Sequence, residues 1–201
     1  MRKKIKYDDF YHETIKKILF RLTEGRFYAK IIAIKAQKDQ KMIIRPATIA
    51  DVDAANEIYD MARGFMREAG NPNQWNSAYP GKKDIVDGIS DGTSYVCEEN
   101  GEIVATFYFK IGDDPTYAEI FDGAWLNGEP YAVIHRIAVK HHGRGIVDAC
   151  FNFCFDRFPS LKIDTHEDNI PMQKCLERCG FRYCGIIYTW NGDKRRAYQK
   201  I

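Results

Sequence analysis

A glycine turn between an apolar stretch and a helix-like run is the part of this sequence best suited to chemistry. The apolar stretch covers residues 131–139, the turn KHHGRG covers 140–145, and the helix-like run covers 146–158. Gly143 and Gly145 let the backbone bend tightly and let a phosphate approach without meeting a Cβ. The free N–H groups of a first helical turn, and the helix dipole, favour negative charge. The junction therefore predicts a cradle for an anionic group.

The composition is that of an ordinary globular protein. The chain has 201 residues, of which 45% are hydrophobic and 29% charged, which is enough to bury a core without disulfides or metal. No apolar run approaches the ~20 residues that span a bilayer. The start, Met-Arg-Lys-Lys, is not followed by a continuous apolar segment or a small-residue cleavage site. We expect a cytoplasmic protein with no membrane partner.

Six cysteines raise the question of metal or redox chemistry. None forms a CxxC motif, and two pairs are spaced i, i+4 on expected helices: Cys150 with Cys154, and Cys175 with Cys179. The alternative is that they are small buried hydrophobic residues in a reducing compartment. We favour this alternative and predict no metal site.

The charge is unevenly distributed. Residues 1–41 contain 12 Lys/Arg against 5 Asp/Glu, whereas residues 42–201 contain 18 against 23. A basic segment can bind nucleic acid or an anionic surface, but such segments are more often solvated tails. We therefore predict a basic extension over residues 1–41, a separate domain over residues 42–201, and no nucleic-acid partner.

The extension has two interpretations. Residues 42–46 open a clean structural unit, and Lys38-Asp39 can be encoded by AAG-GAU, which resembles a bacterial ribosome-binding site just before Met42. One hypothesis is therefore that translation starts at Met42; a peptide from residues 1–37, found by mass spectrometry of the native protein, would refute it. The rival hypothesis is a genuine added helix that covers a sheet edge or an oligomer interface, which leaves a homodimer open.

The order of expected elements indicates the fold class. A capping box at Thr48 and Asp51 starts the first helix, and Gly70 ends it; Asn-Gly pairs at 100–101 and 191–192 mark hairpins. Strands are expected at 42–46, 93–98, 102–110, 131–139, 161–166, 181–189 and 195–201, with further helices at 82–89, 145–158 and 170–179. This order predicts an α/β domain with a mixed sheet and helices on its faces.

This order, with the glycine turn after the fourth strand, resembles the GNAT superfamily of acyl-CoA-dependent N-acetyltransferases, of bacterial type, over residues 42–201. The family turn reads Arg/Gln-x-x-Gly-x-Gly/Ala, and here Lys140 takes the first position. Asn169 after the fifth strand and a helix ending in Gly180-Phe181 also match. A Rossmann dinucleotide site is disfavoured, because a hairpin precedes the turn and position 148 is Asp rather than a third glycine.

The resemblance implies a mostly antiparallel sheet whose fourth and fifth strands splay apart around the pantetheine arm of acetyl-CoA, the acyl donor. The thioester carbonyl would be polarised by a backbone N–H of Ile137 or Ala138, the pyrophosphate would rest on the amides of residues 142–147, and Asn169 would hold the pantetheine or the helix start. The implied CoA-binding residues are Ile137, Ala138, Val139, Lys140, His142, Gly143, Arg144, Gly145, Ile146, Val147 and Asn169. Of these, Lys140, His142 and Arg144 could add side-chain charge.

The resemblance also implies the reaction. An acetyl group would pass from acetyl-CoA to a primary amine of a small molecule or peptide, by direct attack in a ternary complex without a protein nucleophile. Many family members protonate the leaving thiolate with a tyrosine four residues before the Gly-Phe pair, where this chain has Leu176. Water, Cys175, Cys179 or unassisted departure are alternatives. Leu176 also favours the alternative of a catalytically silent CoA-binding or interaction module.

His135 is the first candidate for the general base. An imidazole has a suitable ordinary pKa, and strand alternation predicts that His135, Ile137 and Val139 share one face. In arylalkylamine N-acetyltransferases, which belong to the same superfamily, the second of two strand histidines falls at His135. Asp164 and His166 on the next strand are runners-up. The alternative is a sheet-face histidine bonded to a neighbour.

The connection over residues 111–130 is a candidate wall of the acceptor pocket. It carries five acidic residues and no Lys or Arg, and it is long enough to be functional. With the loop near residue 75, it would favour a cationic amine that carries an apolar group. The candidate acceptor-binding residues are Trp75, Tyr79, Tyr117, Asp122 and Trp125. The alternative is that the acidic residues face water and the aromatic residues belong to the core.

Overall fold

Seven strands form one mixed sheet in the computed structural model, which describes residues 42–201. The predictions for residues 1–41 lie outside the described residues. The strands are β1 (Met42–Pro46), β2 (Ser94–Glu99), β3 (Glu102–Ile111), β4 (Ala132–Val139), β5 (Leu161–Thr165), β6 (Arg182–Tyr188) and β7 (Lys194–Lys200). They lie in the order β1-β2-β3-β4-β5-β7-β6, and every neighbouring pair is antiparallel except β4 and β5.

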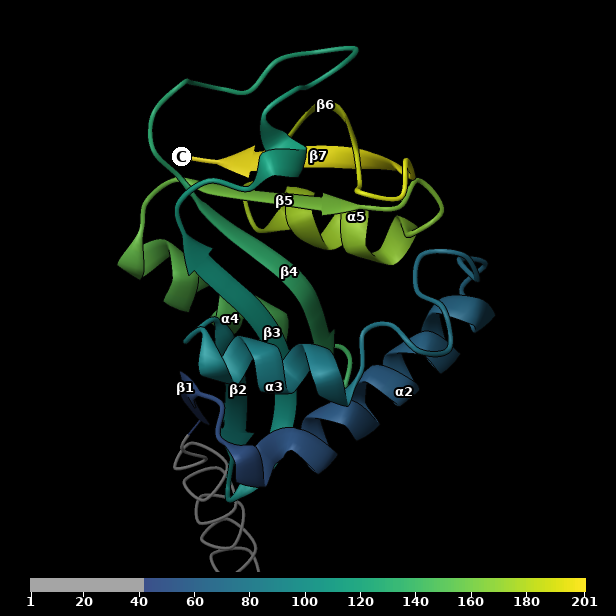
Figure 1. Ribbon diagram of the computed structural model, residues 1–201, viewed down its shortest axis with the longest axis vertical. Helices are drawn as coiled ribbons and strands as arrows, with labels where there is room; N and C mark the ends of the chain where they lie inside the picture. Colours follow the sequence, from purple (N-terminus) through teal and green to yellow (C-terminus); the bar gives the residue numbers. More distant parts are fainter. Residues whose placement is uncertain (1–41) are drawn as a thin grey trace, which may run out of the picture. The chain divides into compact units, whose positions relative to one another are not determined.

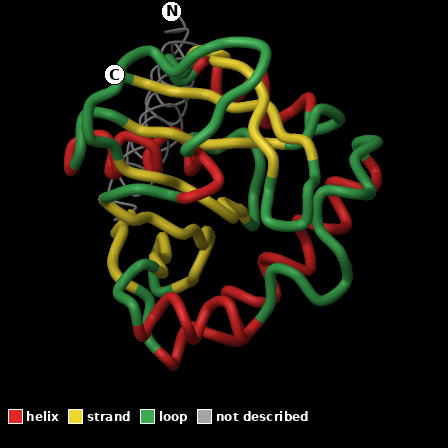
Figure 2. The backbone as a smooth tube through the Cα atoms, turned by 45° about the horizontal axis from the view of Figure 1, so that its top comes forward, coloured by secondary structure: helices red, strands yellow, loops and turns green. Residues whose placement is uncertain are grey.

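Helices lie on both sides of this sheet (Figure 2). They are α2 (Val52–Glu68), α3 (Lys82–Ser90), α4 (Ile146–Arg157) and α5 (Ile170–Arg178), with 3-10 turns at Ile49–Asp51 and Pro115–Tyr117. The predicted capping box is present: the Thr48 backbone N–H donates to the Asp51 carboxylate at 2.8 Å. The predicted α/β fold class is therefore confirmed, with element ends within a few residues of those expected.

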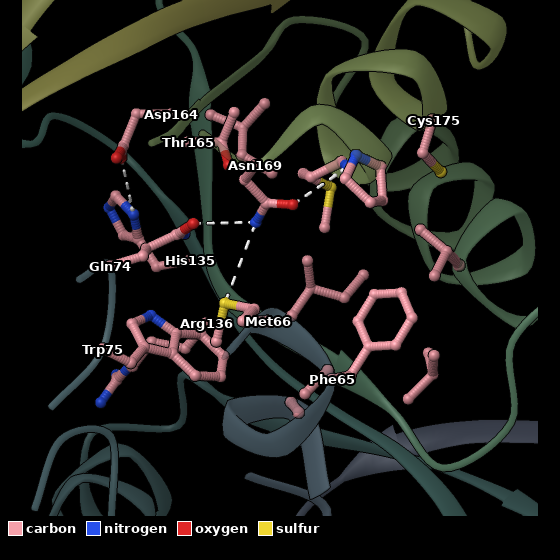
Figure 3. Close-up of a pocket in the computed structure, with 18 of the residues that line it drawn as sticks. Phe65, Met66, Gln74, Trp75, His135, Arg136, Asp164, Thr165, Asn169 and Cys175 are labelled. Atoms are coloured by element: carbon pink, nitrogen blue, oxygen red, sulfur yellow. Dashed lines mark hydrogen bonds and ion pairs between the residues drawn. The ribbon is translucent and has the colours of Figure 1, made fainter. Parts of the chain in front are cut away.

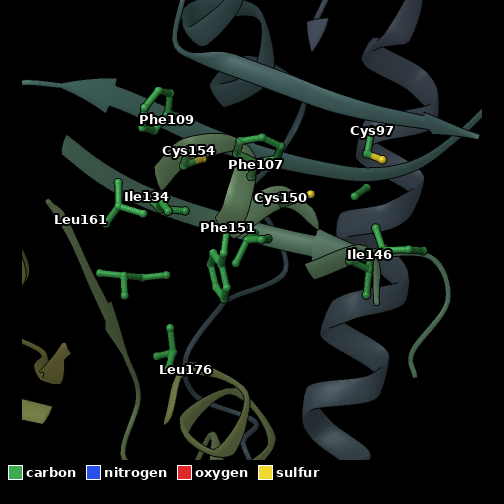
Figure 4. Close-up of a cluster of buried hydrophobic side chains, with 14 of the residues drawn as sticks. Cys97, Phe107, Phe109, Ile134, Ile146, Cys150, Phe151, Cys154, Leu161 and Leu176 are labelled. Atoms are coloured by element: carbon green, nitrogen blue, oxygen red, sulfur yellow. The ribbon is translucent and has the colours of Figure 1, made fainter. Parts of the chain in front are cut away.

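Two apolar clusters attach the helices to opposite faces of the sheet. The larger one joins α4 and α5 to the strands through Phe151, Cys154 and Leu176, all at most 1% exposed (Figure 4). The second packs α2 and α3 against the other face through Ile58 and Ile85. Burial of this apolar surface is the main stabilising term of the domain.

The cysteines confirm the apolar interpretation for the buried positions. All six are free thiols, and four of them, Cys97, Cys150, Cys154 and Cys184, are buried. Three of these four belong to the larger core cluster (Figure 4).

The pairing between β4 and β5 is short. Only Ala132 with Leu161 and Val133 with Lys162 form register pairs, and beyond them the two strands diverge (Figure 1). The remaining edge of β4 has no strand partner on that side among the described residues. The expected splay is thus present, and it exposes backbone N–H and C=O groups in the middle of the sheet.

A β-bulge at Arg136 changes the face to which the second half of β4 points. Arg136 has a φ of 54°, and the register with β3 shifts so that Phe107 faces both Arg136 and Ile137. Ile137 and Val139 therefore enter the α4 core, whereas His135 lies on the opposite face. The prediction that these three residues share one face is wrong, because the extra residue inverts the alternation after His135.

Candidate active site

A cavity of about 1100 Å³ follows the gap between β4 and β5. At one end it is lined by the glycine turn and the first turn of α4, and at the other by a histidine between two carboxylates. Figure 3 draws side chains from α2, its following loop, β4, β5 and α5 around it. The fold therefore joins the predicted anion cradle and the predicted acid–base residues in one continuous space.

The glycine turn has the backbone conformation that an anion cradle needs. Gly143 and Gly145 have φ values of 75° and 74°, which side chains rarely adopt. Gly145 is the N-cap of α4, so the free N–H groups of that helix start directly after it. No Cβ fills the cradle at either glycine. The residues present therefore fit a phosphate group.

The side chains around the turn are less available to a bound anion than the sequence indicated. Lys140 pairs with Glu102 at 2.8 Å and does not line the cavity, and Arg144 pairs with Glu99 at 2.8 Å. His142 stacks on Phe65, with ring centroids 4.0 Å apart. Burial, and then the nearby His141, lower the pKa of His142. Both effects disfavour a positive charge on His142.

Asn169 holds the start of α5. Its side-chain oxygen accepts a hydrogen bond from the backbone N–H of Met172 at 3.2 Å, as a helix N-cap does. Its amide N–H donates to Gln74 Oε1 at 2.8 Å (Figure 3). Of the two roles considered for Asn169, this geometry supports the helix start.

At the other end of the cavity, His135 lies between two carboxylates. Its Nε2 is 2.9 Å from Asp114 Oδ2, and its Nδ1 is 3.5 Å from Asp164 Oδ1. The Tyr117 hydroxyl donates to Asp164 at 2.7 Å, and Arg195 Nε lies 3.8 Å from the second oxygen of Asp164. We call Asp114, His135 and Asp164 the acid–histidine cluster.

The carboxylates hold a proton on the histidine. Burial alone would lower the pKa of His135, but the contacts with Asp114 and Asp164 outweigh it and raise the pKa to about 9. Burial would likewise raise the pKa of both carboxyls, but contact with His135 holds both below their usual range. At pH 7 the cluster is an imidazolium between two carboxylates and carries a net negative charge.

The predicted acceptor and base residues separate into two groups. Trp75 and Tyr79 line the cavity beside the cluster. Tyr117 is buried behind Asp164, and His166 lies near Asp168 outside the cavity. The other two also lie outside it: Asp122 is exposed, and Trp125 donates from its indole N–H to the Tyr117 carbonyl.

Two cavity residues, Asp114 and Arg136, were not among the residues predicted for the site. Asp114 precedes Pro115 and accepts from the backbone N–H of Thr116, which is the Asx-turn pattern of an Asp-Pro sequence. That turn was a usable signal for a fixed carboxylate. Arg136 lines the cavity only because of the bulge, and pairs with Asp84 at 3.3 Å.

Leu176 does not reach the cavity. It is fully buried in the core cluster, while the preceding residue, Cys175, lines the cavity wall. The Cys175 sulfur accepts a hydrogen bond from Arg178 at 3.4 Å, and the Cys179 thiol donates to Asp148 at 2.8 Å.

Two other kinds of feature, a membrane-spanning helix and a metal-binding cluster, are absent from the described residues. Over residues 42–201, no helix is long and apolar enough to cross a membrane. The same range contains no group of three or more His, Cys, Asp or Glu side chains placed to hold a metal ion.

Comparisons with known proteins agree with this architecture. Residues 55–181 match the model of the acetyltransferase (GNAT) family. An acetyltransferase of the GNAT family from Streptococcus agalactiae is 32% identical, with a TM-score of 0.73 over 80% of this chain and 95% of that one.

Two further structures share the fold at lower identity. A GNAT-family acetyltransferase from Listeria monocytogenes is 20% identical, with a TM-score of 0.60 over 79% of this chain and 94% of that one. A ribosomal-protein-alanine N-acetyltransferase from Brucella melitensis is 19% identical, with a TM-score of 0.54 over 79% and 99%. A search of curated proteins gave no match.

Proposed function

The chain belongs to the acetyltransferase (GNAT) family, and from this premise we propose that it transfers an acetyl group from acetyl-CoA to a primary amine of a small molecule or peptide, by direct attack in a ternary complex. One observation carries the proposal. The β4–β5 pairing stops after two residue pairs, and the cavity that follows runs from the glycine turn to the acid–histidine cluster.

The donor half of the cavity would bind acetyl-CoA through backbone groups. The amides after Gly145 would receive the pyrophosphate, and the unpaired edge of β4 at Ile137 and Val139 would pair with the pantetheine arm as a further strand. A backbone N–H of Ile137 or Ala138 would polarise the thioester carbonyl. Acetyl-CoA supplies the activated acetyl group; the chain positions it.

The acceptor half would bind and deprotonate the amine. Its cluster carries a net negative charge and lies beside Trp75 and Tyr79, which suits a cation with an apolar group. His135 already holds a proton at pH 7 because its pKa is about 9. It would therefore act as the base only in its minor neutral form, or as the pH approaches 9.

The test is thiol release from acetyl-CoA with a panel of primary amines. We expect turnover with at least one amine that carries an apolar group, and no turnover without an amine. Asp114→Asn should raise the KM for a cationic amine about tenfold or more, since it removes one charge of the acceptor site. Asp113→Asn is the matched control, because Asp113 is exposed and does not line the cavity. Binding of CoA without turnover of any amine would instead support a silent CoA-binding module.

A further inference from the structure

Thr165, the last residue of β5, is a buried polar residue that the cavity leaves unexplained. It is 0% exposed and lines the cavity between β4 and β5 (Figure 3). Within residues 42–201 its hydroxyl has no hydrogen-bond partner. A buried hydroxyl without a partner costs about 1–3 kcal/mol. Such a group beside a cavity indicates that a ligand supplies the missing partner.

The face of Thr165 is set by strand alternation. Leu161 and Ile163 point into the core beneath α4 and α5, and the side chain of Asp164 points to His135. Thr165 therefore lies on the same face as Leu161 and Ile163, one residue beyond the level of Asp164. This is also the face that Leu176 of α5 packs against.

Thr165 carries the strongest donor among the candidates on this face. Leu176 has no polar atom, and the Cys179 thiol donates to Asp148. The Cys175 sulfur accepts from Arg178, and its S–H is a weaker donor than a hydroxyl. A hydroxyl can donate to a sulfur atom without losing its own proton. The departing sulfur of an acyl-CoA is a charged acceptor in need of such a donor.

We propose that the Thr165 hydroxyl donates a hydrogen bond to the sulfur of bound CoA and stabilises it as it leaves. In the reaction, the amine nitrogen bonds to the acetyl carbon, the carbon–sulfur bond breaks, and sulfur keeps the electron pair. The amine proton passes to the base, the thiolate is finally protonated from solvent, and Thr165 stays protonated throughout. This inference rests on the proposed acetyl transfer.

The test compares two ligands, CoA and desulfo-CoA, by titration calorimetry of the full chain. Thr165→Val keeps the shape and removes the hydroxyl. We expect it to weaken CoA about 2- to 12-fold, the loss of one hydrogen bond, and to leave desulfo-CoA unchanged. We expect Thr165→Ser to restore CoA affinity. In turnover, kcat of Thr165→Val should fall about tenfold or more, because the bond strengthens as charge develops on sulfur.

Controls separate this inference from its premise and from a structural effect. Thr106→Val removes another hydroxyl from a fully buried threonine that does not line the cavity, and it should change neither affinity. Thr165→Val should not lower the urea midpoint, since the lost hydroxyl has no partner among the described residues. Equal losses for CoA and desulfo-CoA, or none, would overturn the inference. If the wild-type chain bound neither ligand, the proposed function itself would fail.

Discussion

At the scale of single residues, the protonation of His135 decides how the site works. Asp114 reaches Nε2 from the loop after β3, and Asp164 reaches Nδ1 from β5. Both ring nitrogens are thus directed at carboxylates, so the ground state at neutral pH is an imidazolium. The alternative considered from the sequence, a sheet-face histidine bonded to a neighbour, describes this geometry. The role of His135 as general base stays a proposal, and it applies to the neutral imidazole.

The base role predicts an alkaline rate limb. If neutral His135 removes the proton, kcat should rise about tenfold per pH unit until the pH approaches the His135 pKa of about 9. A peptide α-amine titrates within this range, at about 7.7–8.0, so the part of the limb above pH 8 reports on His135. We expect His135→Gln to lose the limb in steady-state assays from pH 6.5 to 10. An unchanged limb in that variant would remove His135 as the base.

The same contacts predict a pH-dependent contribution to stability. Because the pKa of His135 is raised, its stabilisation is fully present below its ordinary value of 6.5 and is lost as the pH rises through about 9. His135→Gln should therefore cost about 1–3 kcal/mol at pH 6, allowing for solvent screening of a partly exposed imidazole, and clearly less at pH 10.

Urea unfolding at pH 6 and pH 10 measures this difference. His166→Gln is the control, because His166 lies outside the acid–histidine cluster. If His135→Gln lowered the free energy of unfolding equally at both pH values, the charge contribution would be contradicted, and the loss would be attributed to packing alone.

At the scale of elements, the bulge in β4 builds both halves of the site. It lets Ile137 and Val139 join the core below α4, while His135 lies on the opposite face; all three line the cavity, as does Arg136. It does so at the cost of a left-handed conformation at a residue with a side chain, whose φ is 54°. Strain of this kind persists where the surrounding structure fixes it, often at functional sites.

A pair of variants isolates that strain. Arg136→Ala and Arg136→Gly both remove the contacts with Asp84 and Tyr108, but only glycine adopts a positive φ freely. Arg136→Gly should therefore be the more stable of the two by about 1 kcal/mol. The difference in free energy of unfolding measures this directly. Equal stabilities would mean that the bulge relaxes when the arginine is lost.

At the scale of the whole molecule, residues 42–201 form a compact unit by themselves. The two main apolar clusters cover the two faces of its sheet. The division of the chain at Met42 remains a proposal, and so does its interpretation as the true start. Both concern residues outside the described range.

Truncation tests the division. A chain that begins at Met42 should unfold cooperatively in urea, monitored by circular dichroism, and should keep acetyl transfer within about twofold of the full chain, since the core and the cavity come from residues 42–201. The full chain is the control. Aggregation of the truncated chain, or loss of its cooperative transition, would show that residues 1–41 belong to the folding unit.

The sequence by itself determined the features encoded by neighbouring residues. Alternation, the capping box at Thr48 and the Gly143–Gly145 turn each need only local backbone preferences, so the strands, the helices and the anion cradle were predictable. The family resemblance then implied the mostly antiparallel sheet and the splay of β4 from β5, whereas the order of the strands in the sheet came from the structure.

Only the tertiary structure decided the acid–base site. His135 lies 21 residues from Asp114 and 29 from Asp164 in the sequence, and no local sequence pattern predicts that the three side chains are in contact. The bulge at Arg136 is likewise visible only in the register of β4 against β3, and it inverts the expected face of Ile137. Side-chain direction beyond a bulge and the pKa of a buried group depend on what the whole fold places around them, so neither follows from residue type and spacing alone.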